Sequence, residues 1–500
     1  MPTKSIAIVG GGLAGLSAGI FARLCGLEAH VFEQHSLPGG VCTSWKRKDF
    51  LIDGCLHWLM GANPDSSMYR IYEQVGALDG MHLKVLHHFG RFTWLDEKGQ
   101  SVRSMDITSN LDQMLKDWRN LSPQDAQVFD ILGKGIRAFQ DYRADWDATE
   151  EGAGWWARLK MLWTSRKQFS YFGSYRMPVE KFAEQIQDPF VRWQITNSFV
   201  PQMPVFFLFM VLGELTGGRL ARIEESSLAF AQALAKRLES LGGKISYRAD
   251  VDKILVENDR AVGLRLVDGT EHRADITVSA ADGHSTIFKL LGGRYADAAI
   301  RKRYETHPLF EPIVIVSFGV NRSFPGEPSA HSIKQTCIVN TGDCPQDMFY
   351  YKIFNENPSF APSGKTVVQA ILRAKYDIWE KLSADRVAYD REKQRISEEV
   401  LGCLEPRYPG ISTQVEMTDV ASPMTYIRYT RNYHAAWEGW LMTPQAFMER
   451  IPKTLPGLSG FYMAGQWVQP GGGIPTVILS GRSVIRKICR AEGRIFPQFT

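Results

Sequence analysis

The sequence lacks the features that define several simple classes of protein. Among its 500 residues there are only 7 cysteines, an odd and scattered set with no Cys-x-x-Cys pair. This pattern excludes a disulfide framework and speaks against a zinc site, so we expect reduced thiols and no bound metal. Internal repeats and low-complexity segments are also missing, which leaves a globular protein too long for one core.

An excess of one charge is missing as well. The 58 Lys and Arg residues nearly balance the 54 Asp and Glu residues, for a formal net charge of +4. A net charge so close to zero does not favour binding to nucleic acid. No apolar run reaches about eighteen residues, so we expect no membrane-spanning helix. The first apolar run is followed by glycines instead of a cleavage site, so we expect no signal peptide and a cytoplasmic location.

What the sequence does contain is a dinucleotide-binding motif near its start. The segment SIAIVGGGLAG sets Gly10, Gly12 and Gly15 in G-x-G-x-x-G spacing between an apolar strand and a helix. The glycines permit a tight turn, a close approach of phosphates and packing of the helix on the strand. A second strand, LEAHVF, ends at Glu33, whose carboxylate can accept from ribose hydroxyls. Together these elements predict a Rossmann-like α/β domain, with a Gly-rich turn of another α/β unit as the alternative.

A second glycine-rich segment near the C-terminus favours FAD over NAD. Gly465 follows an aromatic strand, and Gly471 to Gly473 precede an apolar helix that opens near Ile474. A helix N-terminus preceded by glycines can face an anion or the polar edge of a ring. Two such sites at opposite ends of one chain suit a long, two-ended cofactor. A second G-x-G-x-x-G is missing, so we expect no tight nicotinamide site.

These motifs resemble those of the family of phytoene desaturases, carotenoid cis–trans isomerases and retinol saturases. Four further segments carry the resemblance: Gly39-Gly40, Gly217-Gly218 with the later GGKISYRADVDKILVENDRAVGLRLVDGT, SPMTYIRYT, and PGGGIPTVILSG. They span nearly the whole chain, which is therefore identified as a member of this family. The resemblance also implies that Gly39 and Gly40 lie near the pyrophosphate or ribityl chain and that Val251 borders the adenine.

The resemblance implies an enzyme with noncovalently held FAD. Such an enzyme acts on C=C or allylic C–H bonds of a hydrophobic polyene or isoprenoid lipid, by hydride transfer through flavin N5. Desaturation, saturation and cis–trans isomerisation all remain open, and quinone or oxygen are candidate electron acceptors. Two alternatives are a flavin amine oxidase for a small polar amine and a noncatalytic, flavin-bound lipid carrier.

The order of segments predicts two interleaved domains. A Rossmann-like FAD-binding domain (GR2-type) is expected from residues 1–75, 217–290 and 455–500. A mixed-sheet substrate domain is expected from residues 76–216, which include a helical lid, and from residues 291–454. Within the FAD-binding domain, two strands are expected to turn at Asn258-Asp259.

Candidate catalytic residues come from two segments. In IDGCLHWLMG, which resembles a stretch of retinol saturases, we expect Trp58 to line the substrate slot and His57 to bond a flavin edge or relay a proton. The alternative is a core histidine bonded to a backbone carbonyl. In SPMTYIRYTRNY, Tyr429 or Arg428 is expected at the cavity wall, the alternative being an ordinary strand with stacked Arg–Tyr pairs.

The segment 154–172 predicts a helix that lies on a membrane. Trp155, Trp156 and Trp163 share one helical face, while Arg and Lys residues lie elsewhere. Aromatic residues at headgroup depth and cations for anionic lipid are typical of interfacial helices. We therefore expect a membrane-facing lid and peripheral membrane contact, with a core-facing amphipathic helix as the alternative.

Overall fold

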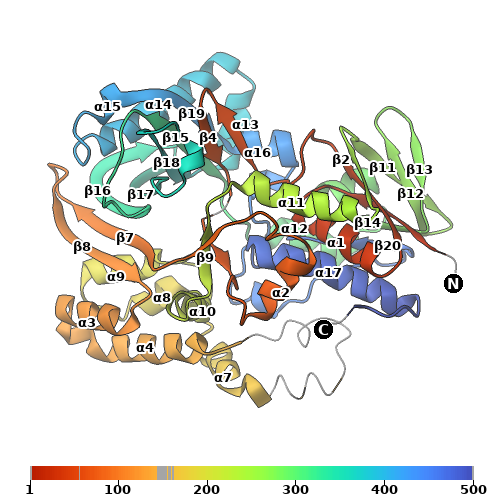
Figure 1. The fold of residues 1–500 in the computed structure, drawn as a ribbon, viewed down its shortest axis with the longest axis horizontal. Helices are drawn as coiled ribbons and strands as arrows, with labels where there is room; N and C mark the ends of the chain where they lie inside the picture. Colours follow the sequence, from red (N-terminus) through yellow and green to blue (C-terminus); the bar gives the residue numbers. More distant parts are fainter. Residues whose placement is uncertain (1–2, 56, 144–154, 156–158, 160–162, 498–500) are drawn as a thin grey trace.

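A five-stranded parallel sheet forms one half of the molecule (Figure 1, right). The computed structural model describes residues 3–55, 57–143, 155, 159 and 163–497. The strand order is β10-β2-β1-β14-β20. The strands are β1 (Ser5–Val9), β2 (Glu28–Glu33), β10 (Lys244–Tyr247), β14 (Ile276–Ser279) and β20 (Phe461–Met463). They come from the start, middle and end of the chain, so this sheet depends on contacts between distant segments.

Helices cover one face of this sheet, and a small antiparallel sheet covers the other. The helices are α1 (Leu13–Leu24), α11 (Ser227–Ser240) and α17 (Gly473–Ala491). The small sheet consists of β11 (Val251–Glu257), β12 (Arg260–Leu266) and β13 (Glu271–Arg273). The turn expected between β11 and β12 is confirmed, because Asn258 and Asp259 both have left-handed backbones, with φ of 46° and 55°.

The other half of the molecule contains a seven-stranded mixed sheet with the order β19-β15-β18-β17-β16-β7-β8. Its strands are β7 (His88–Leu95), β8 (Ser101–Thr108), β15 (Ile313–Val320), β16 (Ala330–Asn340), β17 (Pro345–Ile353), β18 (Thr366–Arg373) and β19 (Val415–Ala421). Only the pairing of β16 with β7 is parallel in this described sheet. Helices α13 (Tyr376–Ser383) and α14 (Arg386–Leu404) pack against it, and the predicted α/β fold with a mixed sheet is confirmed.

A group of helices lies below this sheet in Figure 1. It comprises α3 (Leu111–Leu121), α4 (Ala126–Gln140), α7 (Arg166–Ser174), α8 (Val179–Ala183), α9 (Pro189–Asn197) and α10 (Val205–Thr216). Helix α10 is apolar on almost every side, which suits a helix surrounded by a core. A side chain at Gly213 would meet the Phe139 backbone, so α10 and α4 are in close contact. Each fully buried Phe or Leu here contributes about 1.5–3 kcal/mol.

Several short elements complete the two halves. They are β3 (Ser44–Arg47), β4 (Phe50–Asp53), β5 (Leu59–Met60), β6 (Leu83–Val85), β9 (Leu220–Ile223), α2 (Ser67–Gln74), α12 (Ala298–Thr306) and α15 (Ile411–Gln414). In the part of the chain that the structure describes, no helix combines the length and the apolar character needed to cross a bilayer.

The alternative of an ordinary strand at Arg428 and Tyr429 is wrong, because this segment forms helix α16 (Pro423–Thr430). The Ser422 side chain accepts a hydrogen bond from the Met424 N–H, and the Thr425 side chain accepts one from the Ser422 N–H. Pro423 occupies the first turn, where its missing N–H does no harm. A capping box therefore overrides the β-branched and aromatic composition that suggested a strand.

Candidate active site

A cavity of about 920 Å³ extends across both halves of the molecule. Its wall includes the carboxyl ends of β1 and β2 in the parallel sheet, together with residues of α10 and β17 from the other half. The carboxyl edge of a parallel sheet is where open α/β proteins bind their ligands. The volume lies at the upper end of the range of about 300–1,000 Å³ found for ligand pockets.

The turn from β1 into α1 forms a glycine cradle in the cavity wall. Gly10 has a φ of +97°, and an added Cβ at Gly15 would overlap the Gly10 carbonyl oxygen. Gly12 is different, because its φ of −70° is ordinary and an added Cβ would meet only the Gly39 oxygen, at 3.9 Å. Gly10, Gly12, Gly39 and Gly40 line the cavity, whereas Gly15 is absent from its described lining and packs under the turn. No side chain caps the N-terminus of α1, so its N–H groups can face an anion.

Glu33 lies next to this cradle at the end of β2. Its carboxylate accepts hydrogen bonds from the N–H groups of Gly11 at 2.6 Å and His35 at 2.7 Å. Burial raises the pKa of this carboxyl, while the two N–H groups act in the opposite direction. Glu33 and Val251 both line the cavity, so the structure brings together the residues that were expected around an adenosine.

The sequence analysis missed an ion pair in the same part of the wall. The Arg431 guanidinium donates two hydrogen bonds to the Asp250 carboxylate, at 2.7 and 2.6 Å, and both residues line the cavity. Arg431 ends α16 in the left-handed conformation, with a φ of 56°. Because this turn points the side chain away from the helix, helical or strand periodicity gave no signal for it.

The N-terminus of α17 provides a second glycine cradle. Gly465, Gly471 and Gly473 have φ of +99°, +123° and +77°, and Ile474 follows them in the cavity wall. Its N-cap residue is Gly472, and the Glu438 carboxylate accepts a hydrogen bond from the N–H of Gly473 at the start of the helix. The Glu438 carboxylate, which the sequence analysis did not consider, lies against this turn, and burial raises its pKa to about 7. At neutral pH this group is therefore divided between its charged and neutral forms.

His57 lies in the cavity wall between β4 and β5. Its ring meets Tyr350 edge-on, with centroids 5.7 Å apart. Burial lowers its pKa to about 3, and the charge of Lys352 acts in the same direction. Its Nδ1 has no hydrogen-bond partner among the described residues. His57 is therefore a neutral side chain in the cavity wall, and its Nδ1 is available for a hydrogen bond within the described structure.

The other candidates are distributed over different surfaces. Trp58 lines the cavity, and its ring lies 6.0 Å from that of Phe89. Tyr429 also lines the cavity, but it is 44% exposed and its ring contacts His35 in the loop after β2. Arg428 is exposed, stacks over Tyr429 and is absent from the described lining. The structure therefore does not bring Arg428 to the cavity wall, because α16 turns it toward solvent.

Aromatic and aliphatic side chains dominate the wall supplied by the helices. They are Phe172, Phe199, Met203, Phe206, Phe207, Met210 and Phe447. The ring of Phe206 contacts those of Phe172 at 4.8 Å and Phe447 at 5.0 Å. A wall of this kind excludes water and suits an apolar ligand.

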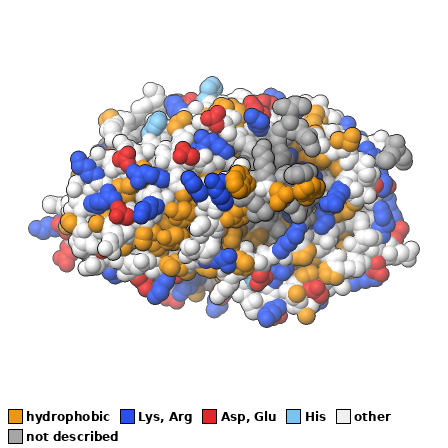
Figure 2. All heavy atoms as spheres, turned by 90° about the horizontal axis from the view of Figure 1, so that it is seen from below, with side chains coloured by type: hydrophobic (Ala, Val, Ile, Leu, Met, Phe, Trp, Pro, Cys, Tyr) orange, Lys and Arg blue, Asp and Glu red, His pale blue; other side chains and the backbone are white. Residues whose placement is uncertain are grey.

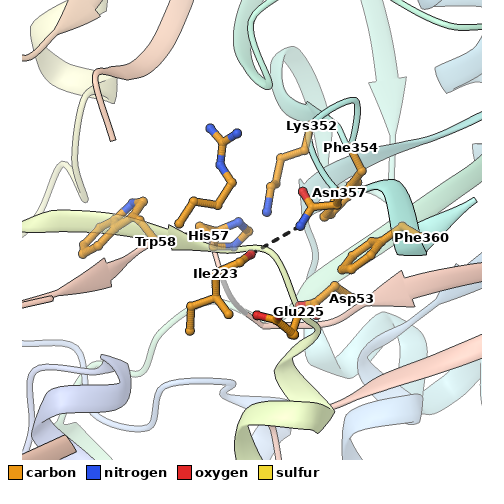
Figure 3. A pocket seen from close by; sticks show the side chains of 10 residues that line it. Asp53, His57, Trp58, Ile223, Glu225, Lys352, Phe354, Asn357 and Phe360 are labelled. Carbon is orange, nitrogen blue, oxygen red and sulfur yellow. Dashed lines mark hydrogen bonds between the residues drawn. The ribbon is translucent and has the colours of Figure 1, made fainter. Parts of the chain in front are cut away.

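Polar side chains interrupt this apolar lining near β17, and the sequence analysis did not single them out. Tyr350 and Lys352 of β17 line the cavity with Arg222 of β9. The Asp53 carboxylate lies close by and accepts from the Ser227 N–H at 2.6 Å. Figure 3 shows Lys352 and His57 directed toward the same space. These polar residues come from segments that are far apart in the sequence, so no local motif could have predicted that they lie together.

The sequence matches a known protein family and several named relatives. The model of the family described as flavin containing amine oxidoreductase matches residues 13–489. Prolycopene isomerase 2 of an Oncidium hybrid cultivar is 23% identical, over 95% of this chain and 82% of its own length. A lycopene-forming phytoene desaturase of a Paracoccus species is 21% identical, over 96% of each chain.

Solved structures share the fold. A putative protoporphyrinogen oxidase from an Exiguobacterium species superposes with a TM-score of 0.61 and 16% identity, covering 98% of this chain and 99% of its own. A putrescine oxidase bound to putrescine superposes with a TM-score of 0.59 and 13% identity, covering 98% and 99%. At these low sequence identities, the similarity shows a shared fold and nothing more.

Proposed function

Because the chain belongs to the family of flavin containing amine oxidoreductases, we propose that it is an FAD-dependent enzyme for C=C or allylic C–H bonds of a hydrophobic polyene or isoprenoid lipid. One observation carries this proposal. A single cavity joins two glycine-rich helix N-termini, at α1 and α17, to an apolar aromatic wall. The first feature suits a long cofactor with a pyrophosphate, and the second suits a lipid.

The residues present fit FAD. The space in front of Gly12 would accommodate a pyrophosphate at the N-terminus of α1, and Glu33 would accept from the ribose hydroxyls. The turn from Gly471 to Gly473 would face the polar edge of the ring system. When bound, the flavin supplies hydride transfer at N5, which serves desaturation, saturation and isomerisation.

The side chains around the apolar wall would hold and orient the substrate. Phe206 and Phe207 would exclude water from the reacting carbons, and Trp58 would restrict the position of the chain. His57, neutral and with a free Nδ1, is placed to hydrogen bond a polar group or to hold a proton at that atom.

The proposal predicts a specific response of the flavin to lipids. In the purified protein under anaerobic conditions, we expect the oxidised or photoreduced flavin to respond to phytoene or prolycopene in detergent, as monitored by visible absorption and chromatography of the polyene. Loss of oxidised flavin indicates a desaturase, reoxidation of reduced flavin a saturase, and altered geometry without net redox change an isomerase. A response to putrescine alone would support the amine oxidase alternative, and no response to any lipid or amine would support the carrier.

We also propose that the surface around α7 docks on a membrane beside the substrate cavity. Trp155 and Trp163 are 60% and 71% exposed, and Phe169 of α7 is 38% exposed. The Arg166 guanidinium lies 4.8 Å from the centre of the Trp163 ring. Phe172, one turn further along α7, lines the cavity. Trp156, the third tryptophan of the predicted face, lies outside the described residues.

The face seen in Figure 2 supports this proposal, since hydrophobic side chains lie there among Lys and Arg side chains. Removing both tryptophans with Trp155→Ala/Trp163→Ala is expected to weaken binding to vesicles of phosphatidylcholine and phosphatidylglycerol by about tenfold or more, because two large apolar groups no longer enter the interface. Flotation of the vesicles measures the bound fraction.

A matched control is Val102→Ala/Val387→Ala, which removes apolar side chains that are 62% and 66% exposed on other elements. This pair should float like the wild type. Equal flotation of all three proteins would contradict a docking role for the α7 surface.

A further inference from the structure

Glu438 lies where the second glycine cradle meets apolar side chains of the cavity wall. Its carboxylate accepts a hydrogen bond from the Gly473 N–H, and an added Cβ at Gly472 would overlap its Oε2. Met442 lies against Gly471 in the same turn, and both Glu438 and Met442 line the cavity. The structure therefore holds a carboxyl group directly at the N-terminus of α17.

The surroundings of Glu438 adjust its affinity for a proton. Its neighbour Trp437 also lines the cavity, and the Trp437 ring lies 6.0 Å from that of Phe310. Burial raises the pKa of Glu438 to about 7, while the Gly473 N–H acts in the opposite direction. Near neutral pH the charged and neutral forms are therefore both populated, and the group can take up or release a proton there.

Other charged groups of the described cavity wall do not control Glu438. The charged side chains that are not among the causes of its pKa shift are Glu33, Arg222, Asp250, Asp282, Lys289, Lys352 and Arg431. The first turn of α17, from Gly473 to Thr476, contains no charged residue. Because burial and the helix N-terminus set the protonation of Glu438, a new charge that arrives beside it would change that protonation.

Glu438 differs from the other carboxylates of the wall in its position. Glu33, Asp250 and Asp282 lie at or just beyond the carboxyl ends of β2, β10 and β14 in the parallel sheet. His57, whose pKa is about 3, is a weak base at neutral pH. Glu438 is therefore the ionisable group of the described wall that combines contact with the α17 turn and a proton affinity suited to neutral pH.

We propose that Glu438 exchanges a proton with the polar edge of the bound flavin each time the ring system gains or loses an electron pair. The inference rests on the proposed function, in which the turn from Gly471 to Gly473 faces that edge. Hydride from a C–H bond of the substrate brings two electrons and one proton to the ring, so one negative charge remains there. A proton from the neutral Glu438 carboxyl balances this charge, and the resulting carboxylate regains a proton from water. Reoxidation of the ring releases the proton by the reverse route.

Electrostatic linkage gives this exchange a measurable sign. A negative charge on the ring disfavours the carboxylate beside it, so reduction raises the pKa of Glu438 above its value of about 7. By reciprocity, the carboxylate makes an electron pair harder to add. Below about pH 6 Glu438 is neutral in both redox states and does not affect the potential, whereas above about pH 7 its charge lowers the potential.

The test measures the midpoint potential of the flavin-loaded protein from about pH 5.5 to about pH 9, by equilibration with redox dyes. In the wild type, the decrease of potential with pH should become steeper above about pH 7, because one more proton accompanies each electron pair. Glu438→Gln, whose amide oxygen can still accept from the Gly473 N–H, should match the wild type near pH 6 and lack the steeper part. At pH 9 this variant should bind the electron pair at least about tenfold more tightly than the wild type, which is about 30 mV for a two-electron couple.

Absorption of the oxidised flavin provides a second measurement. A spectral change centred near pH 7 is expected in the wild type and not in Glu438→Gln, since only the carboxyl group changes its charge. Glu438→Asp, which keeps a carboxyl group, should retain part of the pH dependence. The matched control is Glu398→Gln on α14, where the exposed Glu398 accepts from Gln394 and does not line the cavity within the described residues. This control should follow the wild type in both measurements.

Coincident curves of potential against pH for the wild type and Glu438→Gln would overturn the proposal. If that variant loses its flavin, the wild-type curve still decides, because a curve without a steeper part above about pH 7 contradicts proton uptake by Glu438. This failure is distinguishable from failure of the proposed function. If the flavin responds to phytoene or prolycopene but the curves coincide, only the role of Glu438 is wrong, whereas a protein that holds no flavin would overturn the proposed function itself.

Discussion

Replacement of Gly12 by valine is expected to give a folded protein that no longer holds a flavin. The φ of −70° at Gly12 is open to any residue, and an added Cβ meets only one atom, the Gly39 oxygen at 3.9 Å. The new side chain would therefore enter the cavity and occupy the space in front of the N-terminus of α1. If a pyrophosphate binds there, its affinity should fall by at least about 100-fold, because the N–H groups of the helix can no longer be approached.

The measurement combines visible absorption of the purified variant with circular dichroism and thermal unfolding. Gly402→Val is a suitable control, since Gly402 lies in α14 and nothing stands within 4 Å of its added Cβ. Gly15 would be a poor choice, because a side chain there overlaps the Gly10 carbonyl and damages the fold itself. A Gly12→Val protein that is folded and still fully yellow would contradict the assignment of the cofactor site.

Replacement of Met210 by arginine is expected to abolish turnover of a polyene while the flavin stays bound. Met210 lies on α10 and faces the cavity among the aromatic side chains of its apolar wall. A guanidinium at this position would narrow the space and would lose its water whenever an apolar chain entered. The cost of removing such a charge from water is several kcal/mol, so kcat/KM should fall by at least about 100-fold.

The flavin spectrum and its chemical reduction should be unchanged in Met210→Arg, since the glycine cradles are on other elements. Val387→Arg provides the control, because Val387 is 66% exposed on α14 and does not line the cavity within the described residues. Turnover equal to that of the wild type would show that the substrate does not use the wall at α10. Loss of the flavin together with activity would show that the effect is not specific to the substrate.

The half of the molecule that contains the parallel sheet could be predicted well from the sequence, because its signals are local. A strand, three spaced glycines and a helix determine the turn at Gly10 and Gly12 within a few residues, and the geometry of that turn follows from the missing Cβ atoms. Glu33 could be found in the same way, because it ends the next strand of the same unit. The glycines before α17 formed a second local signal of the same kind.

The segment around Arg428 and Tyr429 shows where local signals mislead. Its composition favours a strand, but the cap formed by Ser422 and Thr425 begins a helix instead. The change of element turns Arg428 to solvent and leaves Arg431, which was not selected for the cavity wall, at the cavity. The left-handed backbone of Arg431 at the end of α16 separates its direction from that of Arg428, one turn earlier on the helix.

By itself, the sequence determined the α/β fold, the glycine-rich turns and the class of enzyme, because these depend on short spacings and on glycines such as Gly10 and Gly15, where a side chain would be strained or would clash. Only the tertiary structure decided which polar groups line the cavity. Lys352, Tyr350, His57 and Arg222 come from strands and loops more than a hundred residues apart in places, and they meet only when β17 and β9 have docked on the loop after β4. The cost of burying a charge such as that of Lys352 depends on what surrounds it, and those surroundings exist only in the folded chain.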